Sequence, residues 1–297
     1  GNQSTASATL DVTIDTTEPA APGTPDLEAA SDTTPTVSGT AEAGSIVELT
    51  SDIDGVVGTD TADGSGNWSI TTGTLSETTH TLTATATDTA GNSGVASAAL
   101  DVTIDATTPV TPSAPDLSAA SDSGTADDDD LTNDTTPTFA GTAEAGTTVT
   151  LSSSIDGTVG TATADATTGV WIITASTLAD GTHDLTATAT DTAGNQSSSS
   201  TVLSVTVDTV APAAPAAPDL DPTSDSGTTD TDDITNDTTA TLSGTAEAGA
   251  SLELTSDQDG VVGTGAADGA GDWSITTSEL SEAVHSLTTT ATDAAGN

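Results

Sequence analysis

One ten-residue phrase returns three times along this chain, at intervals of about the length of one domain. TATATDTAGN occupies residues 83–92 and 186–195, and TTTATDAAGN occupies residues 288–297. GTAEAG recurs in step with it, and one tryptophan follows each copy: Trp68, Trp171 and Trp273. Repetition at this spacing predicts tandem copies of one domain.

Within each repeat, apolar and polar residues alternate. In HTLTATATD, Leu82, Ala84 and Ala86 alternate with threonine, and the same period of two runs through residues 8–15 and 67–71. Gly, Asp and Asn interrupt these runs, as tight turns require. We therefore predict about seven short antiparallel strands per repeat, packed as a β-sandwich with Greek-key connections.

Proline-rich segments separate the repeats and suit extended, semi-rigid linkers. We expect residues 1–15 to be a terminal strand of a preceding or neighbouring domain. Domains then follow at 16–105, 106–208 and 209–297, and the third lacks its last strand. The chain has no leader segment or initiator methionine, so we interpret it as an internal piece of a longer protein.

Charge restricts the partners of this chain. It has no Lys or Arg and a formal charge of -46, and only ten of its 46 acidic residues are Glu. Such a surface excludes nucleic acid and anionic membranes, and no run is long enough for membrane insertion. No disulfide can form without Cys, and no Lys–Asn isopeptide can form without Lys. The core is thin and rich in Ala and Val, so a cation is the expected source of extra stability.

Several motifs together resemble one family. SDSGTxDxDxxTNDTT, SGTAEAG, DGxGxW, HxLTATATDxAGN and VTVDTVAP are similar to the bacterial immunoglobulin-like repeats of giant calcium-dependent RTX adhesins, which type I secretion exports from Gram-negative bacteria. The resemblance covers nearly the whole chain. It implies an all-β chain of tandem immunoglobulin-like β-sandwich domains arranged end to end at the bacterial cell surface. It also implies Ca²⁺ at and near the domain junctions, and a role in cell adhesion and biofilm formation.

The acidic loop between the first two strands is the first candidate site. The family pattern implies calcium ligands at Asp122, Asp127, Asp129, Asp134, Asp225, Asp230, Asp232 and Asp237. Calcium takes about six to eight oxygen ligands, and Asp-x-Asp spacing lets two carboxylates converge on one ion. The alternative is a solvated acidic loop that only keeps the protein soluble. The first repeat retains only Asp32 of this pattern, so we expect fewer ions and more bending at the first junction.

The domain poles form the second candidate site. Because strands alternate in direction, Glu42, Glu144 and Glu247 should share one pole with Asp88, Asp191 and Asp293, while Asp15, Asp105 and Asp208 lie at the other. We expect Asp105 to approach Glu144 and Asp191, and Asp208 to approach Glu247 and Asp293, as calcium ligands. For Asp88, Asp191 and Asp293 the alternative is that each aspartate only caps its own turn. DIDG at 52–55 and DQDG at 257–260 lack the rest of an EF-hand loop and are predicted to be hairpin turns.

We predict that the chain is not an enzyme. His80, His183 and His285 occupy equivalent positions in the three repeats, which favours a structural role over catalysis. The three tryptophans are predicted core anchors. No nucleophile elbow, HExxH helix or phosphate-binding loop occurs.

Two functions remain open. In the first, the repeats form a calcium-stiffened extender that contacts neighbouring repeats of the same chain. In the second, the chain is a filament subunit. Residues 3–15 would then complete the third domain of another copy, head to tail, by strand donation.

Overall fold

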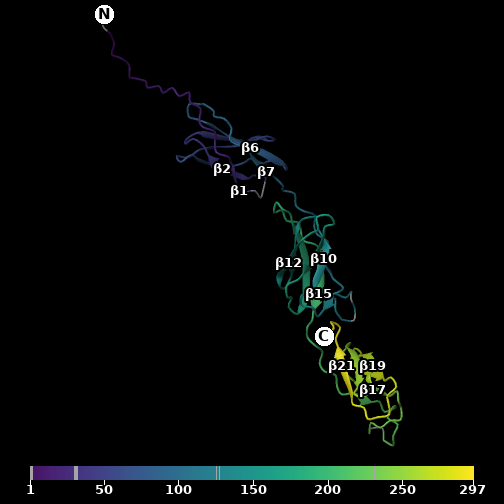
Figure 1. Ribbon diagram of the computed structural model, residues 1–297. Helices are drawn as coiled ribbons and strands as arrows, with labels where there is room; N and C mark the ends of the chain where they lie inside the picture. The colour runs from purple at the N-terminus through teal and green to yellow at the C-terminus, as the bar shows by residue number, and fades with distance from the viewer. Residues whose placement is uncertain (1–2, 30–32, 125, 127, 230–231) are drawn as a thin grey trace. The chain divides into compact units, whose positions relative to one another are not determined.

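The computed structural model describes residues 3–29, 33–124, 126, 128–229 and 232–297. Within these ranges the regular structure is β-strand without a helix, so the predicted all-β fold is confirmed. The chain divides into two compact units, residues 1–108 with 192–195 and residues 109–191 with 196–297. The first unit contains the strands of domain 1 and the second contains those of domains 2 and 3 (Figure 1).

Domain 1 has two antiparallel sheets, of strand order β1-β2-β5 and β4-β3-β6-β7. Its seven strands are β1 (Asp26–Ala29), β2 (Thr36–Thr40), β3 (Ile46–Ser51), β4 (Gly55–Thr61), β5 (Asn67–Thr71), β6 (Thr79–Thr87) and β7 (Leu100–Thr103). The β3–β4 hairpin turn contains DIDG, as predicted.

Alternate residues of both sheets meet in one core. Val47 and Leu49 of β3 and Leu82 of β6 are fully buried, and they pack with Trp68 and Ile70 of β5 in the facing sheet. The residues between them are mostly Thr, Ser and Glu and face solvent. The two-residue period therefore becomes a sandwich because successive side chains of a strand point to opposite faces.

Domain 2 repeats this arrangement and adds one strand. Its sheets have order β13-β10-β8 and β12-β11-β14-β15-β9. The strands are β8 (Asp116–Leu117), β9 (Leu131–Thr132), β10 (Thr138–Thr142), β11 (Thr148–Ser153), β12 (Gly157–Thr163), β13 (Val170–Thr174), β14 (Gly181–Thr190) and β15 (Leu203–Val207). Strand β9 pairs in parallel with β15. We did not predict β9, because two residues inside an acidic loop show no periodicity.

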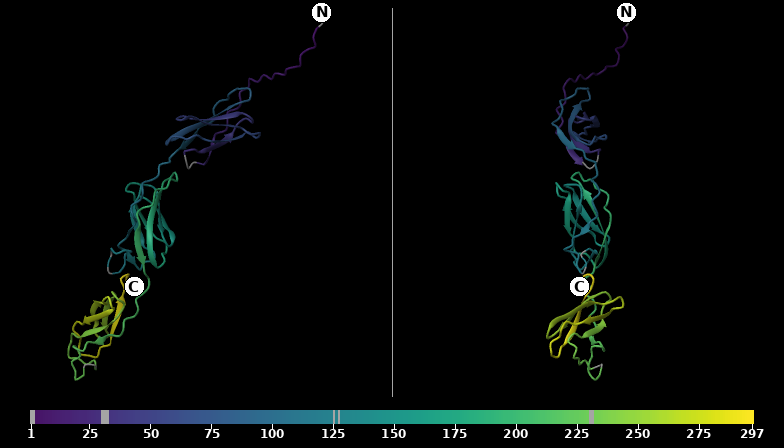
Figure 2. Two further views of the ribbon diagram at one scale, coloured as in Figure 1. Left: turned by 180° about the vertical axis from the view of Figure 1, so that it is seen from behind. Right: turned by 90° about the vertical axis from the view of Figure 1, so that its right-hand side faces the viewer.

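Domain 3 has sheets of order β16-β17-β20 and β19-β18-β21. Its strands are β16 (Asp219–Leu220), β17 (Thr241–Thr245), β18 (Ser251–Ser256), β19 (Gly260–Ala266), β20 (Asp272–Thr276) and β21 (Leu287–Thr292). Among the described residues, no strand pairs with the edge of β21 that corresponds to the β7 and β15 edges of domains 1 and 2. Figure 2 shows the two sheets of each domain from two further directions.

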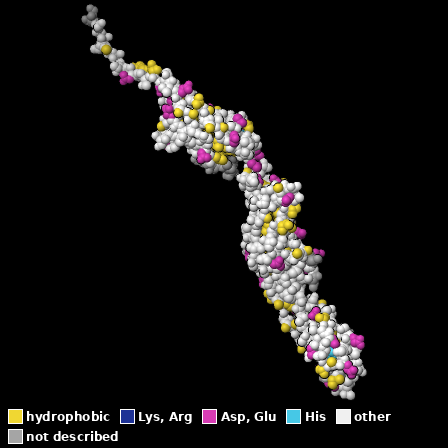
Figure 3. Space-filling model, viewed as in Figure 1, with side chains coloured by type: hydrophobic (Ala, Val, Ile, Leu, Met, Phe, Trp, Pro, Cys, Tyr) yellow, Lys and Arg dark blue, Asp and Glu magenta, His cyan; other side chains and the backbone are white. Residues whose placement is uncertain are grey.

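The surface carries many acidic side chains but no lysine or arginine. Figure 3 shows Asp and Glu spread over the visible face of each domain, with no Lys or Arg among them. Apolar side chains also appear in small separate patches. The part of the chain that the structure describes has no helix that could cross a membrane.

Candidate cation site in the acidic turns and loops

The turn after β6 is closed by Asp88. Its Oδ1 accepts hydrogen bonds from the main-chain N–H groups of Ala90 (2.8 Å) and Asn92 (2.9 Å), and the Asn92 side-chain amide donates to Oδ2 (2.7 Å). Gly91 has a φ of 92°, which glycine adopts without strain. The Asn92 side chain, together with these main-chain donors, holds the pKa of Asp88 below its ordinary value of 3.8.

Asp293 closes the equivalent turn of domain 3. Asn297 donates to it twice, from its main-chain N–H (2.9 Å) and from its side-chain amide (2.9 Å). Burial by itself would raise the pKa of Asp293, but the hydrogen bonds from Asn297 and from the main-chain N–H groups of Gly296 and Ala295 together lower it. Asp88 and Asp293 therefore both cap their own turns, and the hydrogen bonds that they accept favour the charged form of each carboxylate.

The asparagine of each turn makes a second contact that we did not predict. Its side-chain amide donates to the main-chain carbonyl of the aspartate that ends a strand or segment of the preceding repeat. The three pairs are Asn92 with Asp15 (3.2 Å), Asn195 with Asp105 (2.9 Å) and Asn297 with Asp208 (2.8 Å). One amide nitrogen has two N–H donors, so it can serve a carboxylate and a carbonyl together.

Three predicted ligands of the second junction surround one cavity. Asp208, Glu247 and Asp293 line a space of about 160 Å³, with Leu131 on the same wall. They come from the end of β15, the β17–β18 turn and the turn after β21. The three residues thus lie around one space, as the alternating strand directions predicted. Like charges around a common space repel, which favours a bound cation.

The other predicted pole ligands, before and within domain 1 and between domains 1 and 2, accept main-chain hydrogen bonds or lie exposed. Asp15 Oδ1 accepts from Thr17 N (3.0 Å) and Asp105 Oδ1 from Thr107 N (3.1 Å). Glu144 Oε2 accepts from Val110 N (3.1 Å). Glu42 is exposed in the β2–β3 turn, and Asp191 occupies the position of Asp88 in domain 2.

The acidic loops of domains 2 and 3, residues 118–137 and 221–240, each bury one aspartate. Asp122 and Asp225 are both only 8% exposed. In domain 3, Oδ2 of Asp225 accepts from Asp233 N (3.3 Å), while its Oδ1 is buried without a hydrogen-bond donor. Burying an unsatisfied charged oxygen is costly, so this atom is suited to a cation.

Each of the other described ligands predicted in these loops accepts a main-chain hydrogen bond through Oδ1: Asp129, Asp134, Asp232 and Asp237. Within domain 3, Asp232 Oδ1 and the carbonyl oxygens of Thr229 and Ile234 all lie near Gly227. The predicted ligands Asp127 and Asp230, and Asp32 of the first repeat, lie outside the described residues.

Asp130 was not among the predicted ligands, yet it carries the clearest sign of crowding. Its φ is 58°, and the equivalent Asp233 has a φ of 56°, in the left-handed region that non-glycine residues rarely adopt. Burial raises the pKa of Asp130, and the carboxylates of Asp122, Asp116 and Asp129 raise it further. A cation among these groups would relieve their repulsion.

As the side chains stand, no three Asp, Glu or His residues of the described ranges converge closely enough to hold a metal ion. The cavity of Asp208, Glu247 and Asp293 groups carboxylates without bringing their oxygens to one point. Calcium accepts carbonyl and water oxygens as well, at about 2.3 to 2.6 Å. A cation at this cavity would have to draw most of its ligands from main-chain carbonyls, water or side chains that move toward it.

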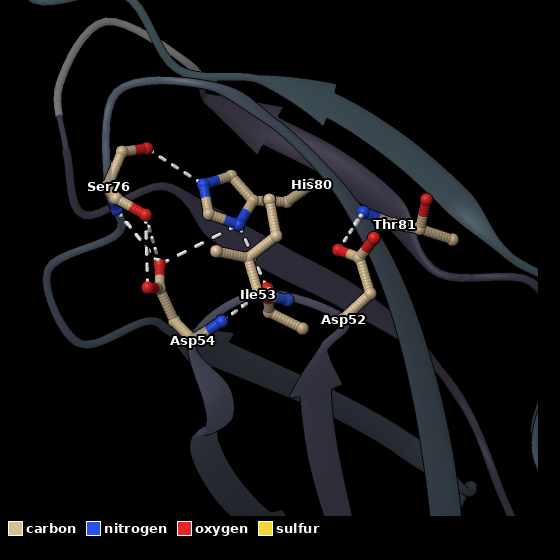
Figure 4. Close-up of polar contacts among 7 residues, drawn as sticks. Asp52, Ile53, Asp54, Ser76, His80 and Thr81 are labelled. Carbon is tan, nitrogen blue, oxygen red and sulfur yellow. Dashed lines mark hydrogen bonds and ion pairs between the residues drawn. The ribbon is translucent and has the colours of Figure 1, made fainter.

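A second polar site recurs in every domain, around the histidine that we interpreted as structural. His80 is fully buried, with Nε2 2.8 Å from the carbonyl of Ser76 and Nδ1 2.9 Å from Ser51 Oγ (Figure 4). A carbonyl only accepts, so Nε2 carries a proton and, in the neutral ring, Nδ1 accepts from the Ser51 hydroxyl. Ser51 Oγ also accepts from the N–H groups of Ile53 (3.1 Å) and Asp54 (3.2 Å).

Asp54 closes this site. Its Oδ2 accepts from Ser76 N (2.9 Å) and lies 3.6 Å from His80 Nδ1 (Figure 4). The Ser76 main-chain N–H is the largest cause that lowers the pKa of Asp54. The equivalent sets are Ser153, Asp156 and His183 in domain 2 and Ser256, Asp259 and His285 in domain 3. The signal in the sequence is S-x-x-D-G, at 51–55, 153–157 and 256–260, of which the first and third contain the predicted hairpin turns.

These residue types also form acyl-transfer triads, but the geometry here is different. Ser51 is 2% exposed, and its Oγ already accepts from two main-chain N–H groups. A nucleophile needs access to substrate and a base that can take its proton. This site instead joins the β3–β4 turn to β6, which supports the structural interpretation of the histidines.

Comparison with solved structures gives similarities of low identity. A structure titled biofilm associated protein, BSP domain, is 20% identical over 65% of this chain with a TM-score of 0.26, and the chain spans 30% of its length. The fibronectin(III)-like modules of Clostridium thermocellum CbhA are 17% identical over 62% of this chain and 94% of theirs, with a TM-score of 0.38. TM-scores this low carry no argument about function.

The comparison with family models is more informative. No curated protein matches the sequence. The model described as bacterial Ig-like domain matches three consecutive stretches, residues 25–106, 108–209 and 211–297. These stretches cover most of the chain and correspond to the three sets of sandwich strands. The chain therefore belongs to the bacterial Ig-like domain family, of which it contains three tandem copies.

Proposed function

We propose that this chain is an extender segment of a secreted bacterial surface adhesin, in which Ca²⁺ stiffens tandem Ig-like domains that hold an adhesive tip away from the cell. Ig-like domains are typically non-enzymatic structural modules. The three copies repeat the main sandwich strands, the turns between them and the histidine site. Recurrence of structural residues suits a module that sets distance. Export as an RTX adhesin by type I secretion and a role in biofilms belong to the same proposal and rest on the sequence motifs.

The observation that carries the proposal is the cavity lined by Asp208, Glu247 and Asp293. Asp208 follows the last strand of domain 2, whereas Glu247 and Asp293 lie in turns of domain 3. A cation bound there would join the two domains and offset the repulsion of three carboxylates. Oxygen ligands and adaptable geometry favour Ca²⁺ over Mg²⁺, which demands a near-ideal octahedron.

The acidic loop of domain 3 supports a second calcium position. Asp225 contributes a buried carboxylate oxygen without a donor, and Asp232 lies in the same loop. An ion bound only by the folded loop stabilises the domain by mass action, since the unfolded chain does not gather the same ligands.

Calorimetric titration of the whole chain with CaCl₂ tests the proposal, together with thermal unfolding and X-ray scattering with and without EDTA. We expect heat of binding, a lower melting temperature in EDTA and a smaller maximum dimension when calcium is removed. The double variant Asp208→Asn, Glu247→Gln should lose the junction ion, whereas the exposed Glu279→Gln should behave as wild type. A chain with no binding heat, and with the same melting temperature and dimension in EDTA, is not a calcium-stiffened extender.

A further inference from the structure

A segment in which every third residue is proline leads into the first strand of each domain. These proline segments are residues 19–25, 109–115 and 212–218. Their prolines are Pro19, Pro22 and Pro25, then Pro109, Pro112 and Pro115, then Pro212, Pro215 and Pro218. A polyproline II helix has three residues per turn and rises about 3.1 Å per residue, so such prolines share one face and lie about 9 Å apart along the axis.

Burial of the proline segments follows the same period of three. All prolines of the first two segments are buried, whereas the residues between them are exposed, apart from the half-buried Ala114. In the third segment the prolines are half-buried and the residues between them are exposed. In domain 1, a β-carbon on Gly94 would meet the carbonyl oxygen of Pro19. A free spacer would expose all its faces, so the proline face is packed against the domain that follows.

Main-chain hydrogen bonds hold each proline segment at the end of a sandwich strand, which is β2, β10 or β17. The residue after the middle proline donates its N–H group to the carbonyl of the last residue of that strand. The pairs are Gly23 with Thr40 (2.8 Å), Ser113 with Thr142 (2.9 Å) and Ala216 with Thr245 (2.9 Å). The approach is close in domain 1, because a β-carbon on Gly23 would lie 2.8 Å from Oγ1 of Thr40.

In domain 2 the proline segment also lies beside the buried tryptophan. A β-carbon on Gly141 would lie 2.5 Å from Cζ2 of Trp171 and 2.8 Å from Oγ of Ser113, so the indole and the segment both pack against Gly141. Near the start of the segment, the N–H group of Val110 donates to Oε2 of Glu144 (3.1 Å). The segment therefore covers part of the sandwich along most of its length.

We infer that each domain carries a surface that binds a polyproline II helix, that its own proline segment occupies this surface, and that the chain pivots only on the three residues before the first proline. These pivots are residues 16–18, 106–108 and 209–211, which follow Asp15, Asp105 and Asp208. The boundary between the two compact units falls at the same place, between Thr108 and Pro109. Three residues span at most about 11 Å of extended chain, whereas ten span about 35 Å.

The docking of the proline segments goes beyond the proposed function because it needs no ion. The three main-chain hydrogen bonds and the buried proline faces use no carboxylate, and Glu144 alone adds one in domain 2. The pivots are therefore equally short with and without calcium. A chain that binds no calcium would still have docked proline segments, so the two proposals fail independently.

Amide hydrogen exchange of the whole chain in EDTA, followed by NMR, tests the docking. The N–H groups of Gly23, Ser113 and Ala216 should exchange far more slowly than those of an unstructured chain, because each is hydrogen-bonded to a sandwich strand. The N–H groups of residues 106–108 should exchange at nearly the unstructured rate. Exchange at the three hydrogen-bonded positions as fast as at residues 106–108 overturns the inference.

Insertion of one threonine tests both the period of three and the position of the pivot. An extra Thr within residues 106–108 only lengthens the pivot, so domain 2 should keep its melting temperature. An extra Thr directly after Pro112 puts Pro109 and Pro112 out of phase with Pro115, so domain 2 should melt several degrees lower. Insertion of Val-Thr-Pro after Pro112, which repeats residues 110–112, restores the phase and should melt as wild type does.

The NMR signals of β11 report the melting of domain 2 in each insertion variant, again in EDTA. Equal melting temperatures for the two single insertions overturn the inference, because a free spacer tolerates an extra residue at either place. A Val-Thr-Pro insertion that lowers the melting temperature as much as the single Thr after Pro112 overturns it as well, since the period of three would then have no effect.

Discussion

The side-chain amide of Asn297 donates one hydrogen bond to the main-chain carbonyl of Asp208 and another to the carboxylate of Asp293, at 2.8 Å and 2.9 Å. It therefore ties the end of the last strand of domain 2 to a turn of domain 3. This hydrogen bond uses the uncharged main-chain carbonyl of Asp208. The acidic cavity is lined by Asp208 and Asp293 as well, so the hydrogen bond and the cavity link the same two residues in different ways. Asn92 makes the same pair of bonds, with Asp15 and Asp88.

Asn297→Ala should lower the free energy of unfolding of domain 3 by about 1 to 2 kcal/mol, because two hydrogen bonds are lost and one acceptor is a charged carboxylate. Urea unfolding in EDTA measures the change without a contribution from calcium. Thr288→Ala removes an exposed side chain of β21 and serves as the control. Equal unfolding midpoints for Asn297→Ala and wild type would show that the amide contributes nothing.

Asn92→Ala should raise the pKa of Asp88 toward 3.8, since the Asn92 side chain is the largest cause that lowers it. A carboxyl group whose pKa is lower in the folded than in the unfolded protein stabilises the fold when the pH is above the unfolded-state pKa. This stabilisation is lost as the pH falls through the folded-state pKa. Wild-type domain 1 should therefore lose stability below about pH 4, and the variant should lose less over that window. NMR titration of the Asp88 carboxyl carbon measures both pKa values. An unchanged pKa in Asn92→Ala would contradict this explanation.

The sequence predicted the parts of the fold that follow from periodicity. Leu82, Ala84 and Ala86 are buried as their alternation indicated, and strand direction correctly grouped Asp208, Glu247 and Asp293. These predictions succeeded because a strand exposes alternate residues and because antiparallel strands place every second turn at the same pole.

What the sequence did not predict depends on single contacts. The pairing of β9 with β15 joins two residues of an acidic loop to a strand about 75 residues away. The Ser51–His80 hydrogen bond joins a hairpin turn to a strand, and nothing in the sequence at either position indicates that the two side chains meet. The Asn195 contact with Asp105 needed the three-dimensional position of a carbonyl group, which no side-chain pattern encodes.

Gly39→Ala should destabilise domain 1 by about 1 to 3 kcal/mol through overpacking. A β-carbon at this position would lie 2.5 Å from Cζ2 of Trp68, and the buried indole cannot move away easily. Gly64→Ala is the matched control, because its β-carbon would meet no atom within 4 Å. Thermal unfolding of both variants should separate them by several degrees. Similar losses at the two positions would contradict the packing argument.

Ser153→Ala should cost domain 2 about 2 to 3 kcal/mol, because the buried hydroxyl serves three partners. It accepts from the N–H groups of Ile155 and Asp156 and lies 2.8 Å from His183 Nδ1. Ser152→Ala, on the outward face of the same strand, should change stability little. Chemical unfolding at neutral pH measures both. A loss no larger than that of Ser152→Ala would show that the histidine site contributes little to folding.

Asp225→Asn should have opposite effects with and without calcium. In EDTA the variant should be more stable by about 1 kcal/mol, because it removes a buried carboxylate whose Oδ1 has no donor and reduces repulsion in the loop. In calcium it should be less stable than wild type, since a charged ligand is lost and binding no longer favours the folded state as strongly. Glu279→Gln changes an exposed acid of the same domain that lies outside the acidic loop, and it should shift neither measurement. Thermal unfolding of each variant in the two buffers gives the four comparisons. A variant that is less stable than wild type in EDTA, with unchanged calcium binding by calorimetry, would assign Asp225 a purely structural role.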